Sequence, residues 1–197
     1  MFVEGTDTCS ITVEWALAEL LANPDKMDLL QSELNKIEGD TKLVDISYLP
    51  KLPYLFVVVK ETMRMHHVLP LLLPHKLTQS CELLGYEILV DTEVYIIVWA
   101  IGHDSNVWDN PSQFHPQIFL DAISVHGVNF DLLPFGSGRR MCPRMPLGLI
   151  TTEFLLASLL HSFEWKACSK PKLNESLGII VRLETPLVVN AYPRLPH

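Results

Sequence analysis

The stretch that decides the fold is Pro134-Phe-Gly-Ser-Gly-Arg-Arg-Met-Cys-Pro-Arg144, which places Cys142 after two glycines and two arginines and just ahead of an apolar segment. Glycines let the backbone come close to a flat ligand. The backbone N–H groups of such a loop, together with the N-terminus of a following helix, stabilise an anion. Flexible, cationic surroundings favour a thiolate over a buried thiol. The stretch therefore predicts that Cys142 holds a metal as a thiolate.

Three other interpretations of this stretch remain open from the residues alone. Cys142 can be a buried structural cysteine beside a turn. The loop can also bind phosphate, although Gly-Ser-Gly without a third glycine or a Gly-Lys-Ser/Thr ending is a weak signal. A hydrolase that pairs Cys142 with one of the eight histidines is remote, because no fixed spacing joins them.

The composition limits the class of protein. The chain has 197 residues, enough for one domain, and its 48% of apolar residues predicts a folded core. A net charge of −8 argues against a general nucleic-acid binder, which needs a basic surface. None of the four cysteines forms a C-x-x-C pair, so a structural zinc site is not expected. The longest strongly apolar run, residues 94–101, is far shorter than the ~20 residues that span a bilayer, so no membrane-spanning segment is predicted.

Helices dominate the expected secondary structure. The spacing of Ile11, Trp15, Ala18 and Leu21 predicts a helix over residues 7–22. Further helices are expected over residues 24–37, 54–66 and 143–160. Short strands are expected over residues 71–78, 82–84, 87–90, 178–183 and 187–191, with a turn at 85–86, while residues 94–102 fit a strand or a short helix and 104–135 an irregular loop. This order predicts an α-rich α+β architecture.

Two more motifs carry candidate chemistry. Glu61 and Arg64 lie at positions i and i+3 of a predicted helix and can pair; on a surface such a pair contributes less than about 1 kcal/mol, whereas buried charges need further partners. In Gly5-Thr6-Asp7-Thr8, a glycine permits close approach of a ligand, and an acid and a hydroxyl stand side by side. From the residues alone, an N-cap formed by Thr6 or Asp7 is the favoured interpretation of this segment.

Taken together and in this order, the three motifs resemble those of the cytochromes P-450, the haem-thiolate monooxygenases. The run Phe135-Gly-Ser-Gly-Arg-Arg-Met-Cys142 matches the haem-binding F-x-x-G-x-R-x-C signature, Glu61 to Arg64 matches E-x-x-R, and Gly5 to Thr8 is similar to the oxygen-activating motif. Residues 71–76, 98–104 and 108–114 are similar to the plant microsomal branch, and within it to terpenoid hydroxylases of the geraniol 8-hydroxylase type. The resemblance covers essentially residues 1–197, which correspond to roughly the last two fifths of a family chain, so we expect the C-terminal portion of a cytochrome P-450 domain.

The resemblance implies a role for each matching residue. Cys142 would be the axial ligand of haem b, with Phe135 shielding the sulfur and Gly136 allowing close approach. Arg139 and His75 would hold haem propionates. Asp7 and Thr8 would relay protons, and residues 68–73 and 177–179 would touch substrate. Glu61 and Arg64 would be structural.

The resemblance also implies a reaction and a location. One atom of O2 would enter a C–H bond of a small lipophilic substrate, a terpenoid or another plant secondary metabolite. Electrons would come from NADPH through a reductase partner, and no nucleic acid would be involved. The expected location is the cytosolic face of the endoplasmic reticulum membrane, with no anchor in this chain itself.

Five positions depart from the family pattern. Glu4 and Arg144 stand where a small residue and a glycine are usual, and His67 and Val68 replace two prolines. Ile118 replaces the arginine that completes a triad with Glu61 and Arg64, so this pair is expected to be less well satisfied. These departures, and the missing front half of the family chain, support an alternative function: a truncated, catalytically inactive fragment that does not bind haem productively.

Overall fold

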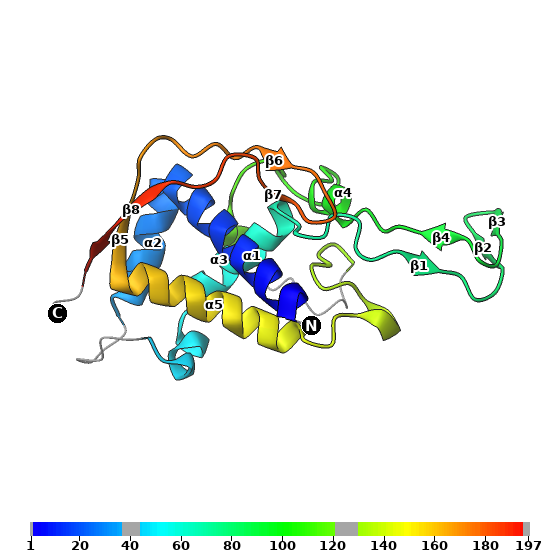
Figure 1. Cartoon of the computed structure of the whole chain (residues 1–197), viewed down its shortest axis with the longest axis horizontal. Coiled ribbons are helices and arrows are strands. Elements are labelled where there is room, and N and C mark those ends of the chain that lie inside the picture. Colours follow the sequence, from blue (N-terminus) through cyan, green and yellow to red (C-terminus); the bar gives the residue numbers. More distant parts are fainter. Residues whose placement is uncertain (1, 37–43, 121–129, 195–197) are drawn as a thin grey trace.

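The computed structural model of the chain describes residues 2–36, 44–120 and 130–194, and side chains from Gly5 onward (Figure 1). Four longer helices form the body: α1 (Phe2–Ala22), α2 (Pro24–Leu34), α3 (Pro53–Met65) and α5 (Met145–Ser162). The shorter helical elements are η1 (Ile46–Lys51), α4 (Val98–Gly102), η2 (Pro116–Phe119) and η3 (Gly138–Arg140).

Proline and a carboxylate define two of the helix starts. Pro24 and Pro53 open α2 and α3 at a position where the missing N–H costs nothing. Glu33 on α2 accepts hydrogen bonds from the backbone N–H groups of Tyr54 and Leu55, at 2.8 and 2.9 Å. This carboxylate caps α3 and holds α2 against it.

The core lies between α1, α3 and α5. Leu20, Leu55, Leu156 and Leu160 are fully buried there. A second, smaller cluster forms where Trp15 of α1 packs on Val181 and Leu183 near the chain's end. The last part of the sequence therefore closes over the first helix.

The strands form two-stranded antiparallel sheets. The pairs are β1 (His75–Lys76) with β4 (Glu93–Val94), β2 (Cys81–Leu83) with β3 (Tyr86–Ile88), β5 (Phe163–Ala167) with β8 (Val189–Pro193), and β6 (Glu175–Ser176) with β7 (Arg182–Leu183). Figure 1 shows β1 to β4 as an arm that projects from the helical body. We refer to residues 71–97 as the β-arm.

The α-rich α+β architecture is confirmed, and several boundaries differ. Helix α1 begins at Phe2, so Thr6 and Asp7 lie inside it, and the expectation that one of them caps the helix is wrong. The turn of the β2–β3 hairpin falls at Leu84–Gly85 rather than at 85–86, and of residues 71–78 only His75 and Lys76 form a strand. Strands β5 and β6 were not anticipated, because Glu164 and Lys166 interrupt the apolar pattern of β5 and β6 has two residues.

One helix bears on the membrane prediction. By length and composition, α5 is apolar enough to cross a membrane, unlike the shorter apolar run at 94–101 from which no membrane-spanning segment was predicted. In this structure α5 packs against α1, α2 and α3, with Leu149, Leu156 and Leu160 buried.

Candidate functional site

The loop before α5 holds Cys142 at its end. The backbone N–H of Cys142 donates to the carbonyl of Phe135 at 2.9 Å and closes the loop. Gly136 and Gly138 adopt φ of 71° and 67°, a left-handed conformation that side chains disfavour, which explains both glycines. The thiol of Cys142 is free and half-buried, whereas Arg139 and Arg140 on η3 are exposed.

The ring of Phe135 packs against the start of α5. A Cβ on Gly148 would lie 3.4 Å from Phe135 Cε1, so the glycine makes room for the ring. The backbone N–H of Met145 donates to the carbonyl of Cys142 at 3.3 Å. The cysteine therefore sits immediately at the N-terminus of α5, where the helix dipole favours an anion.

Helix α1 brings the Gly5–Thr8 motif to the same end of α5. Cys9 Sγ donates a weak hydrogen bond to the carbonyl of Gly148 at 3.9 Å. Figure 1 shows the N-terminal ends of α1 and α5 lying together, next to the cysteine loop. Asp7 and Thr8 are half-buried, and Asp7 Oδ2 lies 3.6 Å from Arg182 Nη2 of β7.

A second segment borders the cysteine loop. A Cβ on Gly136 would lie 3.6 Å from Leu72 Cδ1, so Leu72, within the segment 68–73, lies beside the loop. His75 follows in β1 and is half-buried. The expected contact segment at 177–179 is exposed, with Leu177 and Ile179 80% and 85% accessible.

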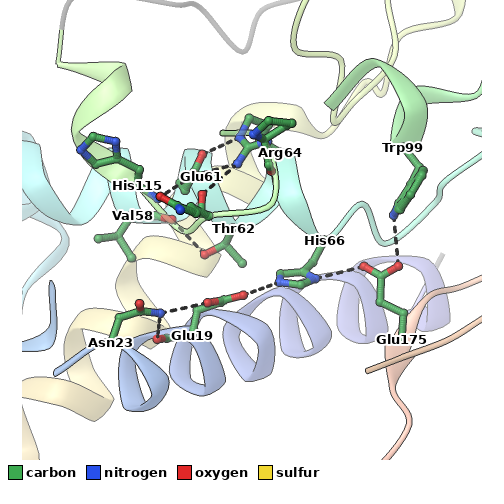
Figure 2. A network of polar contacts seen from close by, with 12 residues as sticks. Glu19, Asn23, Val58, Glu61, Thr62, Arg64, His66, Trp99, His115 and Glu175 are labelled. Atoms are coloured by element: carbon green, nitrogen blue, oxygen red, sulfur yellow. Dashed lines mark hydrogen bonds and ion pairs between the residues drawn. The ribbon is translucent and has the colours of Figure 1, made fainter. Parts of the chain in front are cut away.

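The Glu61–Arg64 pair is buried. The exposed fractions are 0% and 1%, and two hydrogen bonds of 2.7 and 2.9 Å join the guanidinium to the carboxylate. Arg64 also donates to the carbonyls of Gly102, Pro111 and Gln113, at 2.5, 2.9 and 3.4 Å. The pair thus fixes the loop after α4 to helix α3 (Figure 2).

The replacement of a triad arginine by Ile118 does not leave this pair poorly satisfied, and that expectation is wrong. The backbone N–H of His115 donates to Glu61 Oε1 at 2.7 Å, so both carboxylate oxygens accept hydrogen bonds. Ile118 lies on η2 and packs against the apolar core. Backbone groups of the loop therefore supply what a second arginine would supply. Arg144, which stands where a glycine is usual, is exposed, and the side chain of Glu4 lies outside the described residues.

A second buried polar network, which the sequence did not predict, surrounds His66. His66 lies between Glu19 of α1 and Glu175 of β6, at Nε2–Oε1 and Nδ1–Oε1 distances of 2.8 and 3.1 Å (Figure 2). Trp99 of α4 donates from Nε1 to Glu175 Oε2 at 3.0 Å. Its members come from four parts of the chain, and no sequence spacing joins them. The one sequence feature that could have indicated this network is a histidine directly after a buried helix.

Comparison with known proteins identifies the family. The model of the family described as cytochrome P-450 matches residues 1–191. The chain belongs to the cytochrome P-450 family. It is 47% identical over 196 residues to cytochrome P-450 76C1 of Arabidopsis thaliana, covering 95% of this chain and 38% of that protein. It is 44% identical over 193 residues to geraniol 8-hydroxylase of Catharanthus roseus, covering 95% and 39%.

Solved structures of the family have the same fold. A zebrafish cytochrome P-450 with abiraterone superposes with a TM-score of 0.88 at 33% identity, covering 98% of this chain and 46% of that one. The structure is therefore part of the cytochrome P-450 fold. This cytochrome P-450 chain spans about two fifths of the length of the curated relatives that it matches.

Family membership implies a haem, and the residues around Cys142 fit one on its sulfur side. A free, half-buried thiol lies on a loop with two positive-φ glycines, ahead of a helix N-terminus and beside two exposed arginines. This donor set suits an anionic sulfur ligand to iron. Within the described residues, no group of three or more His, Cys, Asp or Glu side chains offers an alternative metal site.

Proposed function

We propose that this chain carries the haem-thiolate part of a cytochrome P-450 monooxygenase, with Cys142 as the iron ligand. The observation that supports the proposal most directly is the meeting of two motifs at one end of α5. The loop of Cys142 precedes α5, and helix α1, which bears Asp7 and Thr8, contacts Gly148 on its first turns. A flat cofactor bound to the sulfur would lie near the start of α1.

The residues present would hold and tune the sulfur. Haem with a thiolate ligand supplies the chemistry that cleaves the O–O bond of dioxygen. The N-terminus of α5 lies just after Cys142 and favours an anionic ligand at this position. Phe135, whose ring packs against Gly148 at the start of α5, would shield the sulfur in this proposal. Arg139 and His75 bind the propionates in this proposal, because Arg139 is exposed beside the loop and His75 follows the segment that touches Gly136.

Asp7 and Thr8 hold and move protons in this proposal. An acid and a hydroxyl at adjacent positions on α1 can pass a proton between solvent and a bound oxygen ligand. Arg182 Nη2 lies 3.6 Å from the Asp7 carboxylate. Both side chains are partly exposed, so this ion pair is weak.

The substrate is a small lipophilic molecule, of terpenoid or related plant secondary metabolism. The support comes from the relatives, which include a geraniol 8-hydroxylase and a ferruginol synthase. Exposed apolar side chains at Leu71, Leu73, Leu177 and Ile179 would then face it or the rest of the enzyme. An NADPH-dependent reductase would supply electrons, and the endoplasmic reticulum membrane is the location that the family resemblance implies.

A second candidate is a chain that does not bind haem productively. The specific observation in its favour is the coverage of 38% of a relative, because the remainder of the relative contains surfaces that this sequence does not supply. Under this alternative the fold and the Glu61–Arg64 network persist, but Cys142 stays a free thiol.

A haem-binding experiment distinguishes the two. The chain of residues 1–197 is expressed with haem supplied, reduced and exposed to carbon monoxide. We expect a strongly red-shifted Soret band, which reports an iron–thiolate bond. Cys142→Ser should abolish the shift, whereas Cys168→Ser, at an exposed cysteine, should leave it unchanged. Absence of the shifted band in the folded parent chain would favour the inactive alternative, and an unchanged band in Cys142→Ser would exclude Cys142 as the ligand.

A further inference from the structure

His66 contacts two carboxylates, those of Glu19 and Glu175. His66 follows α3 and is 6% exposed, and Glu19 on α1 is 2% exposed. Glu175 on β6 is also mostly covered, with a side chain 19% exposed. Both ring nitrogens thus face a carboxylate in a setting with little water.

The chemistry of imidazole restricts the protonation of this group. A neutral imidazole has one N–H donor and one acceptor nitrogen, whereas an imidazolium has two donors. Ionised carboxylates only accept hydrogen bonds. Facing Glu19 and Glu175 together, His66 satisfies both carboxylates only when it is protonated at both nitrogens.

The surroundings of the ring favour that positive charge. Trp15 stacks on His66 with a centroid distance of 3.8 Å and an interplanar angle of 4°. An aromatic face attracts a cation, and more strongly where water is excluded. Asn23 Nδ2 donates to Glu19 Oε2 at 3.2 Å and Trp99 Nε1 donates to Glu175 Oε2 at 3.0 Å, so each carboxylate is oriented from its far side.

We propose that His66 is a charged clamp: as an imidazolium it fastens β6, and through Trp99 also α4, onto α1 and α3, and loss of its proton releases β6. The release is confined to the β6–β7 pair, because β6 has two residues and is paired with β7. Next to this pair, the N–H of Glu184 donates to the carbonyl of Asn174, and the N–H of Val181, just before β7, donates to the carbonyl of Val68, both at 2.9 Å.

The pKa shifts agree with the geometry. Burial lowers the pKa of His66, but the hydrogen bonds and charges of Glu175 and Glu19 outweigh it and raise the pKa above its ordinary value. Burial likewise raises the pKa of Glu175, and the bond to His66 reverses this and lowers it. A histidine whose pKa is higher in the folded than in the unfolded state stabilises the folded state. This contribution to the free energy of unfolding is complete at a pH below the unfolded pKa, and it is lost as the pH rises through the folded pKa. The clamp therefore opens on the alkaline side.

The other titratable and charged side chains near His66 do not supply the positive charge between Glu19 and Glu175. His67, the next residue, is buried and its pKa falls to about 4, mainly because of desolvation, so it is neutral at neutral pH. Burial also lowers the pKa of His103 on α4. Arg64 on α3 is permanently charged and is held by Glu61.

The experiment uses the chain without added haem, so it is independent of the proposed function. Nitrogen NMR of the histidine rings at about pH 7 should show both nitrogens of His66 protonated. Hydrogen exchange should then be followed at the amides of Val181 and Glu184, corrected for intrinsic rates, from about pH 6 to about pH 10. Glu175→Gln keeps the shape and an acceptor for Trp99, yet removes the charge. It should speed hydrogen exchange at the Val181 amide by about tenfold or more, because losing a hydrogen bond to a charged group changes an equilibrium constant by more than about tenfold.

The control variant and the results that would contradict the proposal are read from hydrogen exchange at the same amides. Glu184→Gln changes an exposed carboxylate that accepts a bond from Asn174 next to the same strand pair, and should leave exchange at Val181 unchanged. A neutral His66 ring at about pH 7, or unaltered exchange in Glu175→Gln, would overturn the clamp. Equal acceleration at amides of α3 would also overturn it, because the triad would then stabilise the whole fold rather than hold β6.

Discussion

Two neighbouring histidines show how far the surroundings decide a residue's charge. His66 faces two carboxylates, and its pKa is raised. His67 is desolvated, with only partial compensation from a hydrogen bond to the backbone of Met63, and its pKa falls to about 4. The sequence places identical side chains in adjacent positions. The pKa of His66 is raised because Glu19 and Glu175, which are distant in the chain, lie against its ring.

Arg64 is the residue whose loss should cost the most stability. Arg64→Met leaves the Glu61 carboxylate buried without its cation and leaves the carbonyls of Gly102 and Pro111 without their donor. Removing one partner of a buried pair typically costs about 3–5 kcal/mol. Urea unfolding followed by circular dichroism should show this loss in the free energy of unfolding.

A surface pair gives the matched control. Lys26 and Asp25 lie 2.6 Å apart, and Asp25 is 68% exposed. Lys26→Met should therefore change the free energy of unfolding by less than about 1 kcal/mol. A loss of similar size in both variants would contradict the view that burial makes the Glu61–Arg64 pair important.

At the scale of elements, sequence periodicity predicted the long helices well and the strands poorly. Helices α2 and α3 lie within a few residues of their expected bounds, because each has an apolar stripe and a proline at its start. Helix α5 also lies near its expected bounds, because it is a long apolar segment with a proline near its start. Strands of two or three residues carry no periodicity to detect, and they form only because the chain is held by neighbouring elements. The three motifs were visible as sequence, whereas the carbonyls that satisfy Arg64 could not be seen before the fold was known.

The β2–β3 hairpin has a turn that its sequence does not suit. Leu84 and Gly85 have φ of 52° and 83°, and Leu84 is 90% exposed. Such two-residue turns prefer Asn-Gly, because asparagine tolerates a left-handed conformation that leucine does not. Leu84→Asn should therefore raise the stability of the hairpin by about 0.5–1 kcal/mol.

This gain is measurable as slower hydrogen exchange at the β2–β3 amides. Leu83→Asn is the control, because it makes the same change one residue earlier, in a strand position that pairs with Tyr86. It should bring no gain. Faster exchange in Leu84→Asn than in the parent would show that the leucine side chain stabilises the turn.

At the scale of the whole molecule, the surface is unusually apolar along the β-arm. Leu73, Leu83 and Leu89 are 60–65% exposed there, and further leucines and tyrosines accompany them. Exposed apolar patches of this kind mark interfaces. Because the chain spans about two fifths of its relatives, we interpret this surface as one that the remainder of the family fold would cover.

The folded chain should therefore bind a hydrophobic dye. We expect 8-anilinonaphthalene-1-sulfonate fluorescence to rise with the chain alone, well below the urea transition. Replacing Leu73, Leu83 and Leu89 together by Gln should reduce the signal without lowering the helical circular dichroism. If the folded parent chain does not raise the fluorescence of the dye, the interpretation of the β-arm as an open apolar surface is wrong.

The packing of Trp15 against Val181 and Leu183 has a consequence for synthesis on the ribosome. The segment that covers Trp15 emerges more than 160 residues after helix α1. At translation speeds of about 5–20 residues per second, this helix waits on the order of ten seconds or more for its covering strand. During that delay its indole has no native partner from the chain's end, so nascent molecules should engage chaperones through this helix.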